Sequence, residues 1–551
     1  MDRFICGGEM HQTKKSARVF SVVRVYALWI LIALGFVFFN FAQSGAILGN
    51  DGFQYLSTAK NILTGQGAKT SLIHFDEQHF SGEMPAPQTV FPPGYPLTLA
   101  FFAFLGMSTE AAGVFVSIVA TALLIPVFLW GGKLLKMRTG ILYLLTAFLV
   151  MNSNFSFYAI SILSESLFTL LSFLGLILLV RSEVASEKGE NPNRYLFVGG
   201  IVLGVACWVR YAGVFLVAPM LFYYTLNFLF RRNQRARKAL ILASSCLPLV
   251  IGEFLRNLFL AGNLRGGNLK PAANSFVGLV VNCGHSIVDL LLGSRSPKNW
   301  FPGMKTFFAI AVCLTGLFLV VQGVRNRTAV TRYLCCRPVS LVWLFLIVYL
   351  CGLLYAGKTS VISFGVRMFY PVYPVALMLL GGVLSNILER SPIIRSGLLI
   401  RVSLISGVIF YSLLLLKDTT TSFRSVYTLG MRDAIAQPIG DSRSLTAWLA
   451  THTPEHQPIL AGDGQACGYL TGKDTISLVS TEYSNDTWSE DRIRKTAKRY
   501  NAHLLALFPQ GQFTREIADE SPLINGILHG IVPPWLRLEI KSPSVEVYRL
   551  L

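Results

Sequence analysis

The chain has 551 residues, of which 53% are hydrophobic and only 14% are charged. A water-soluble globular protein has about 25% charged residues, so this chain carries too few charges to cover a soluble surface of its size. Several apolar runs reach the ~20 residues that cross a bilayer as a helix. The composition therefore predicts a polytopic membrane protein and excludes a soluble enzyme, a secreted disulfide scaffold and a disordered chain.

The formal net charge of +19 does not indicate nucleic-acid binding, because of where the basic residues lie. They cluster in short loops between apolar segments, which is the pattern that orients membrane proteins. A nucleic-acid-binding protein instead carries a basic stripe on a soluble module. The nine cysteines form no CxxC and no Cys/His spacing, so neither a zinc site nor a disulfide framework is predicted.

About eleven apolar runs are expected to span the membrane. The first, from Tyr26 to about Leu48, follows a basic N-terminus and is longer than the core of a cleaved signal peptide, so we expect it to be retained. The short pair on either side of Arg210 has the weakest pattern. The ten later runs centre on residues 112–130, 140–157, 163–180, 195–209, 212–230, 239–255, 303–324, 339–356, 369–388 and 397–417.

Alternate loops between these runs are rich in Lys and Arg, and the other loops are poor in both although they are longer. Cytoplasmic loops carry the excess of Lys and Arg, so we expect a multi-pass protein of the inner (plasma) membrane with its N-terminus in the cytoplasm. An odd number of spans then places the C-terminal segment outside. Two large hydrophilic pieces would share the outer face, namely the first loop (residues 48–92) and the tail after residue 417.

The tail has the pattern of a small α/β domain. Residues 443–451 have helical spacing after a candidate N-cap, and residues 458–461, 475–479 and 503–508 resemble short strands separated by glycine-containing turns. The expected organisation is therefore a membrane domain over residues 1–417 and an extracytoplasmic α/β domain over residues 418–551.

The first outer loop opens with an amphipathic helical pattern. Phe53, Leu56, Ala59/Lys60 and Leu63 recur at spacings of three and four residues, which predicts a short helix on the membrane surface. Asp51 stands at the start of this helix, directly after the first span. An aspartate there can cap the helix, and a carboxylate at the membrane–water boundary can also accept a proton from an attacking hydroxyl or amine. The two roles are compatible.

Several segments, taken in order along the chain, resemble one family. The loop helix reads YLSTAKNILTGQG (residues 55–67) and the loop ends FPPGYPL (residues 91–97). These segments, with Asp51 before them, are similar to the GT-C glycosyltransferases, in the style of the bacterial relatives of protein O-mannosyltransferases and of the lipid A aminoarabinose transferase, family 39. Four further segments continue the resemblance: ILSESLF (162–168), GGIVLGVACWVRY (199–211), EFLRN (253–257) and VRMFYPVYP (366–374). Glu253 departs from the family pattern.

The resemblance implies a fold of the GT-C type and a site built from charges at the outer ends of spans. Asp51 would be the base and Glu165 would orient the donor or the acceptor. Arginine binds phosphate through its planar fork of donors. The implied phosphate-binding residues are Arg210, Arg256 and Arg367, with Lys270 and Tyr370 as weaker candidates, and the residues near the acceptor are Asn50, Tyr55 and Tyr95.

Structural roles for the same charges stay open. A charged residue in a span is costly, so it indicates function by default. Glu165 could nevertheless cap a helix at the interface, and Arg210 could be its structural partner. Arg256 and Arg367 could extend their charges to the interface while their stems lie in the bilayer.

A divalent metal is possible but not required. His74, His79, Glu83 and His285 are weak candidate ligands, since His and carboxylate bind zinc. Their spacing matches no metal motif, so a solvated polar loop is the simpler interpretation. Asp51 and Glu165 could instead share a metal with the donor phosphate.

The predicted function is transfer of a sugar from a polyprenyl-phosphate carrier to a protein, lipid or glycan acceptor on the extracytoplasmic face, in a single displacement with inversion. No Walker-type phosphate loop is present, and a lipid-phosphate leaving group makes ATP unnecessary. The alternative from another class is a transporter or flippase of lipid-linked sugars, which would need broken helices or inverted repeats near the midplane. A non-catalytic scaffold is a third interpretation, in which Asp51 and Glu165 would be replaceable without cost.

Overall fold

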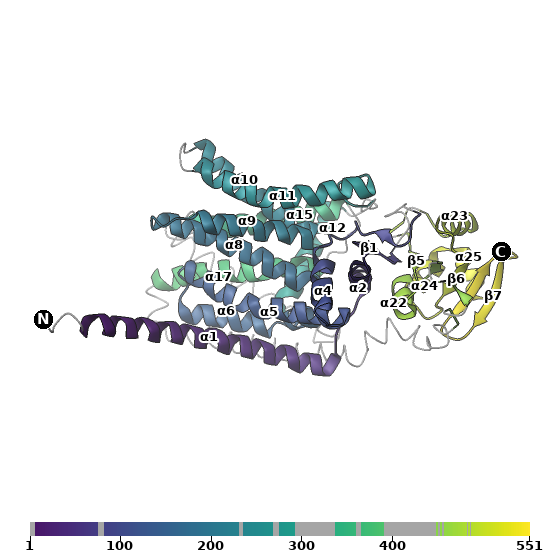
Figure 1. The fold of residues 1–551 in the computed structure, drawn as a ribbon, viewed down its shortest axis with the longest axis horizontal. Coiled ribbons are helices and arrows are strands. Elements are labelled where there is room, and N and C mark those ends of the chain that lie inside the picture. Colours follow the sequence, from purple (N-terminus) through teal and green to yellow (C-terminus); the bar gives the residue numbers. More distant parts are fainter. Residues whose placement is uncertain are drawn as a thin grey trace.

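A helical bundle with an α/β unit at one end makes up the computed structural model of the chain (Figure 1). The structure describes residues 6–74, 82–230, 235–267, 275–292, 337–359, 365–390, 448–449, 452–454, 457–481, 483–484 and 486–551. The N-terminal end of the first helix lies at the end of the bundle opposite the α/β unit. The predicted boundary at residue 417 and the predicted spans at 303–324 and 397–417 lie outside the described residues.

The bundle is formed by apolar helices, as the composition predicts. Among the described residues, six helices are long and apolar enough to cross a membrane, and a seventh crossing is possible if the bent pair α6–α7, with 54° between its helices, counts as one span. The helices of the bundle are α1 (Cys6–Ser44), α5 (Thr109–Leu134), α6 (Thr139–Met151), α7 (Ser153–Ile160), α8 (Glu165–Glu187), α9 (Asn193–Val209), α10 (Val214–Phe230), α11 (Arg235–Ala261), α12 (Phe276–Leu292), α15 (Arg337–Thr359), α16 (Val366–Phe369) and α17 (Tyr373–Arg390).

Burial separates the centre of this bundle from its lipid-facing helices. Most of α8 is buried, whereas only 17% of the apolar window of α1 is buried and Leu31 and Phe38 are more than half exposed. Exposed apolar surface of this kind is stable in hydrocarbon rather than in water. Helices α8 and α9 approach closely at Gly175 and Gly199, where an added methyl group would meet leucine side chains of the pair. Small residues allow such close helix packing in membranes.

The first loop folds against the α/β end of the bundle as α2 (Asn50–Leu63), β1 (Lys69–Thr70), β2 (Leu72–Ile73), β3 (Ala86–Pro87) and α4 (Gly94–Phe104). The predicted helix is present, but its predicted position on the membrane surface is wrong. Leu56 and Ala59 of α2 are buried in the bundle core, and Phe53 is buried against Tyr469 of the tail. Both faces of α2 are therefore covered by protein, with the bundle on one side and the tail on the other.

The tail is an α/β unit, as predicted, and its sheet recruits a strand from the first loop. The strand order is β2-β5-β4-β6-β8-β7, with β2, β5, β4 and β6 parallel and β8 and β7 antiparallel. The predicted strands correspond to β4 (Ile459–Ala461), β5 (Thr475–Ser477) and β6 (Leu504–Leu507), and β7 (Leu536–Lys541) and β8 (Glu546–Leu550) follow. The predicted helix at 443–451 lies largely outside the described residues.

The described residues of this unit include four helices: α22 (Gly464–Thr471), α23 (Glu490–Tyr500), α24 (Gln512–Glu520) and α25 (Pro522–Leu528). Strand β2 pairs with β5 in the register Leu72↔Thr475 and Ile73↔Ile476. Ile73 is fully buried in the apolar core of the tail together with Ile476 and Leu505. The first loop and the tail therefore form one sheet at one end of the bundle.

Candidate active site

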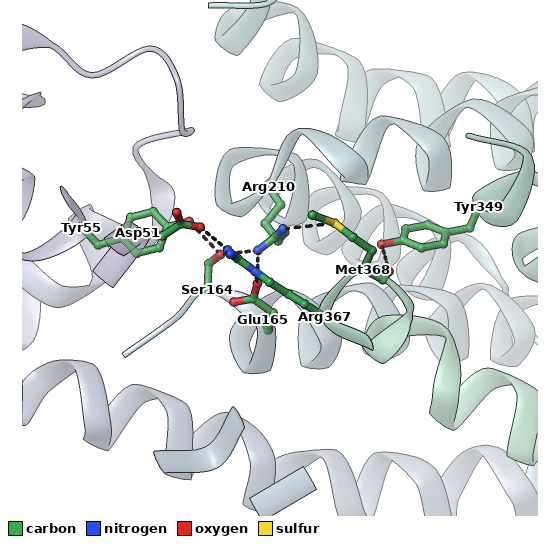
Figure 2. A network of polar contacts seen from close by, with 8 residues as sticks. All are labelled: Asp51, Tyr55, Ser164, Glu165, Arg210, Tyr349, Arg367 and Met368. Carbon is green, nitrogen blue, oxygen red and sulfur yellow. Dashed lines mark hydrogen bonds and ion pairs between the residues drawn. The ribbon is translucent and has the colours of Figure 1, made fainter. Parts of the chain in front are cut away.

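Two carboxylates and two arginines from distant parts of the chain meet where the first loop rests on the bundle (Figure 2). Asp51 lies in the first turn of α2 and Glu165 is the first residue of α8. Arg210 follows the last residue of α9, and Arg367 lies on the short helix α16. Four charges at one position in a membrane protein indicate function, because charges are costly to bury in this setting.

The local sequence explains why these side chains point to one place. Both carboxylates occupy the first turn of a helix, where the helix dipole favours negative charge. Arg210 has extended backbone (φ −150°, ψ 138°) between α9 and the 3₁₀ turn Tyr211–Gly213. This break ends the helix at Arg210, so its side chain crosses to the start of α8.

The predicted capping roles of the two acids are not observed. The N-cap of α2 is Gly49 and that of α8 is Ser164, and neither helix has a side-chain cap hydrogen bond. Asp51 and Glu165 instead bind arginine. Arg367 donates from Nη2 to Oδ2 of Asp51 and from Nε to Oε1 of Glu165, so its guanidinium bridges the two carboxylates.

Arg210 fixes the inner side of the cluster. Its Nη1 donates to Glu165 Oε1 at 2.6 Å and to Ser164 Oγ at 3.0 Å. The Ser164 hydroxyl also lies 3.2 Å from the hydroxyl of Tyr55. Arg210 is thus the structural partner of Glu165, which was one of the alternatives left open by the sequence. A further contact, from Arg210 Nη2 to Met368 Sδ at 3.9 Å, links it to the segment that carries Arg367.

Exposure divides the four charges into an inner and an outer pair. The side chain of Glu165 is 1% exposed and that of Arg210 is 16% exposed, whereas Asp51 is 23% and Arg367 is 30% exposed. The outer pair can therefore exchange partners with a bound molecule. Glu165 of the inner pair binds both arginines and so holds them in position.

The protonation of Asp51 follows from this arrangement. Burial raises the pKa of the Asp51 carboxyl, but the charge and hydrogen bond of Arg367 outweigh it, with smaller contributions from Arg210 and His74, so its pKa lies below the usual value. The carboxylate is therefore ionised at neutral pH and can accept a proton. Burial, together with the charge of Asp51, raises the pKa of Tyr55, so that hydroxyl stays protonated.

Other sequence-predicted residues lie elsewhere. Arg256 belongs to a second polar cluster, where its Nη2 donates to the carbonyl of Gln88 at 2.6 Å and its Nη1 lies 3.3 Å from Glu253 Oε1. In the same cluster Asn257 Nδ2 donates to the Tyr211 hydroxyl at 2.8 Å, which donates to the Thr89 carbonyl at 2.6 Å. These contacts attach the end of the first loop to α11.

The remaining candidates divide between the core and the loop. The ring of Tyr95 packs edge-on against Tyr55 with the centroids 5.0 Å apart, and Tyr370 is buried against Tyr158 at 4.5 Å. Asn50 lines a cavity between the loop and the tail. Lys270 lies outside the described residues.

The weak metal candidates do not converge. His74 lies beside Tyr483 and Phe513 of the tail, and His285 is exposed on α12. Glu83 lies in the loop before β3, and His79 is outside the described residues. The described residues contain no group of three or more metal-binding side chains, and Arg367 stands between Asp51 and Glu165.

Sequence reasoning did not assign roles to Ser164 or Tyr349. Ser164 directly precedes Glu165, which the sequence identified as a site residue. Its position next to Glu165 is the sequence feature that could have predicted its role. Tyr349, whose hydroxyl donates to the Met368 carbonyl at 3.2 Å, supports the α16 segment from α15. Nothing in the local sequence of α15 distinguishes it from other apolar helices.

The architecture is that of a multi-pass membrane protein, and solved structures of GT-C glycosyltransferases share its fold, as the sequence motifs predict. No protein-family model and no curated protein matches the sequence. Solved structures match over nearly the whole chain. One is ArnT from Cupriavidus metallidurans in the apo state, with a TM-score of 0.58 and 12% identity over 96% of this chain and 98% of that chain.

ArnT of the same organism bound to undecaprenyl phosphate matches with a TM-score of 0.56, at 12% identity over 95% of this chain and 97% of that one. The oligosaccharyltransferase of Archaeoglobus fulgidus, in a complex with Zn and sulfate, matches with a TM-score of 0.53 and 12% identity, over 90% of this chain and 69% of that chain. At these identities the likeness establishes the fold.

Proposed function

We propose that the protein is a membrane glycosyltransferase that moves a sugar from a polyprenyl phosphate to an acceptor on the extracytoplasmic face. The observation that carries this proposal is the partly exposed Asp51–Arg367 pair on the buried Glu165–Arg210 pair, in a chain with the GT-C fold. One structure of this fold holds undecaprenyl phosphate, which supports a polyprenyl-phosphate donor. The positive-inside pattern supports a cytoplasmic N-terminus, which would put the cluster and the tail outside.

The proposed donor site uses the two arginines. A phosphate would take hydrogen bonds from Arg367, which is 30% exposed, and from Arg210 behind it. Glu165 would keep both guanidinium groups in place through its single bonded oxygen, Oε1. As the glycosidic C–O bond breaks, negative charge grows on the phosphate, and the arginines would stabilise it.

Asp51 would act as the base once the phosphate engages Arg367. An acceptor hydroxyl or amine would form the new bond to the anomeric carbon and pass its proton to Asp51, while the polyprenyl phosphate leaves from the opposite side. This single displacement inverts the anomeric configuration. Loss of the Arg367 contact would raise the pKa of the Asp51 carboxyl toward its usual value and make it a stronger base.

The transporter alternative gains no support from these contacts. A transporter of lipid-linked sugars would hold its substrate near the midplane of the bundle. The four charges lie instead at the end of the bundle, against the first loop (Figures 1 and 2).

The test is transfer by the full-length chain in lipid nanodiscs, with a pool of radiolabelled polyprenyl-phosphate sugars and envelope acceptors. We expect the wild-type protein to release label from the carrier and the Asp51→Asn variant to lose transfer while it folds normally. Asp491→Asn is the matched control, because Asp491 is 72% exposed and pairs with Lys495 at 2.6 Å, away from the charged cluster. Near-normal transfer by Asp51→Asn would refute the base role, and transport of labelled lipid without any donor consumption would support the transporter.

A further inference from the structure

A shallow cleft that is open to solvent lies between the first loop and the tail. Asn50 and His74 line it from the loop side. The tail contributes the turn after β4, the end of β5 and the start of α24: Gly462, Asp463, Gly464, Gln465, Ala466, Ser477, Leu478, Gln512 and Phe513.

The topology of the sheet makes this position a natural ligand site. From β4 the chain passes through α22 to β5 on one side of β4, and then through α23 to β6 on the other side. The strand order reverses at the carboxyl end of β4. In open parallel sheets such a switch point forms a crevice in which ligands bind, and Asp463 lies in this crevice directly after β4.

Two residues that line the cleft each carry a buried polar atom that has no hydrogen-bond partner among the described residues. These atoms are Oε1 of Gln465 and Oγ of Ser477, and both residues are 4% exposed. Buried polar groups in native proteins are almost always paired, because an unpaired group loses its hydrogen bonds to water without compensation. A bound molecule with hydroxyl groups would supply the missing partners.

The chemistry of the lining selects the class of ligand. Among the described residues, neither lysine nor arginine lines the cleft, and Asp463 contributes a carboxylate that accepts from Thr514 Oγ1 at 2.8 Å. A phosphate or carboxylate ligand would meet this negative charge without a cation to offset it. Amide, hydroxyl and carboxylate groups beside the Phe513 ring suit a neutral molecule that offers hydroxyl groups and an apolar face, which describes a sugar.

We propose that this cleft binds a neutral sugar residue of the acceptor and holds the acceptor over the start of α2. Asn50 lines the cleft and directly precedes Asp51 in the chain, so the cleft borders the turn of α2 that carries the proposed base. The assignment of the ligand as part of the acceptor rests on the proposed function. The assignment of a sugar-binding site rests on the cleft alone.

The test measures binding directly, with the full-length chain in lipid nanodiscs. Methyl glycosides of glucose, mannose, N-acetylglucosamine and arabinose are titrated one at a time by saturation-transfer NMR. We expect at least one to bind, and its affinity to fall at least fivefold in Gln465→Leu and Ser477→Ala. Gln66→Leu, in an exposed turn of the loop, is the matched control and keeps wild-type affinity.

Thermal stability separates a binding role from a structural one. Removing an unpaired buried polar atom should leave the melting temperature unchanged or higher, so Gln465→Leu and Ser477→Ala should lose binding without losing stability. Three outcomes would each overturn the site. The first is that none of the four glycosides binds, and the second is that sodium phosphate displaces the bound glycoside. The third is that binding is lost only in variants whose melting temperature also falls.

Failure of the sugar-site proposal can be distinguished from failure of the proposed function. Glycoside binding by a wild-type protein that consumes no polyprenyl-phosphate donor would refute the transferase and leave the sugar site standing. Transfer with an unchanged KM for the acceptor in both Gln465→Leu and Ser477→Ala would refute the site's assignment to the acceptor and leave the transferase standing.

Discussion

Glu165 is the residue around which the charged cluster is built. Its side chain is 1% exposed, its Oε1 binds both Arg210 and Arg367, and its Oε2 has no hydrogen-bond partner among the described residues. A buried carboxylate is stable only when cations and donors pair with it. Glu165 therefore fixes two guanidinium groups at the base of the site, and its burial leaves Asp51 as the accessible acid.

Arg367→Lys tests the bridging geometry at the scale of one residue. A lysine keeps the charge but cannot donate from two fixed nitrogens to Asp51 and Glu165 at once. We expect transfer to fall about tenfold to a hundredfold, the effect of losing a charge-assisted hydrogen bond of about 1.5–3 kcal/mol. Steady-state transfer in nanodiscs measures it.

The matched control is Arg181→Lys, because Arg181 binds Glu190 at 2.6 Å outside the cluster. That variant should keep wild-type transfer. Equal transfer by Arg367→Lys and Arg181→Lys would contradict a role for the arginine fork in holding the donor.

Breaks in helices bring the site residues together at the scale of elements. Helix α9 ends at Val209 and α10 begins only at Val214, while α16 is separated from α17 by the 3₁₀ turn Tyr370–Val372. The first break gives Arg210 an extended backbone, and the second leaves Arg367 on a separate helix of four residues. The start of α4 supports the first break, because Gly94 packs directly against the backbone of Trp208, two residues before Arg210.

Gly94→Ala tests this packing. The added Cβ would lie 2.5 Å from the Trp208 carbonyl oxygen, and backbone cannot rotate away as a side chain can. We expect a loss of about 1–3 kcal/mol of stability, the usual cost of overpacking, and weaker transfer because Arg210 shifts. Gly252→Ala on α11 meets nothing within 4 Å and serves as the control. Equal melting temperatures for the two variants would show that α4 does not depend on this contact.

At the scale of the whole molecule, strand pairing and His74 join the first loop to the tail. Burial lowers the pKa of the His74 imidazole to about 4, although the charge of Asp51 opposes this. The ring packs between the loop and the tail residues Tyr483 and Phe513, and it shares the cleft with Asp463. His74 is therefore neutral in the docked state at neutral pH.

Acidification should loosen this docking. A histidine released from the tail has a pKa of about 6.5, so it binds a proton below that pH while the docked form does not until about pH 4. The contribution of His74 to docking is complete above about pH 6.5 and is lost as the pH falls toward 4, by at most about 3 kcal/mol. Hydrogen exchange of β2 and β5 should therefore be faster at pH 5 than at pH 7 after correction for intrinsic rates, and His74→Gln should remove the difference. A pH effect of equal size in that variant would assign it to other groups.

The orientation of the whole chain is tested by reporter fusions. Alkaline phosphatase folds actively only outside the cytoplasm, so we expect an active fusion after Leu551 and an inactive one after Arg138, in the first basic loop. Green fluorescent protein at the same positions should give the opposite result. An active phosphatase after Arg138 would reverse the predicted topology.

The sequence alone determined the membrane class, most of the described spans, the helix at the start of the first loop, the α/β character of the tail and the charges that form the cluster. These features follow from composition and from short-range periodicity, which neighbouring residues along the chain define. Asp51, Glu165, Arg210 and Arg367 could be named because a charge at the end of an apolar run is conspicuous.

Only the tertiary structure decided which of these charges meet. Arg367 and Asp51 are 316 residues apart, and the same guanidinium reaches Glu165, 202 residues away. It also decided that Arg256 supports the loop, that β2 joins the sheet of the tail, and that a cleft forms between the two. Such contacts depend on how distant segments pack and on the register of strands from separate parts of the chain, and local sequence patterns carry neither.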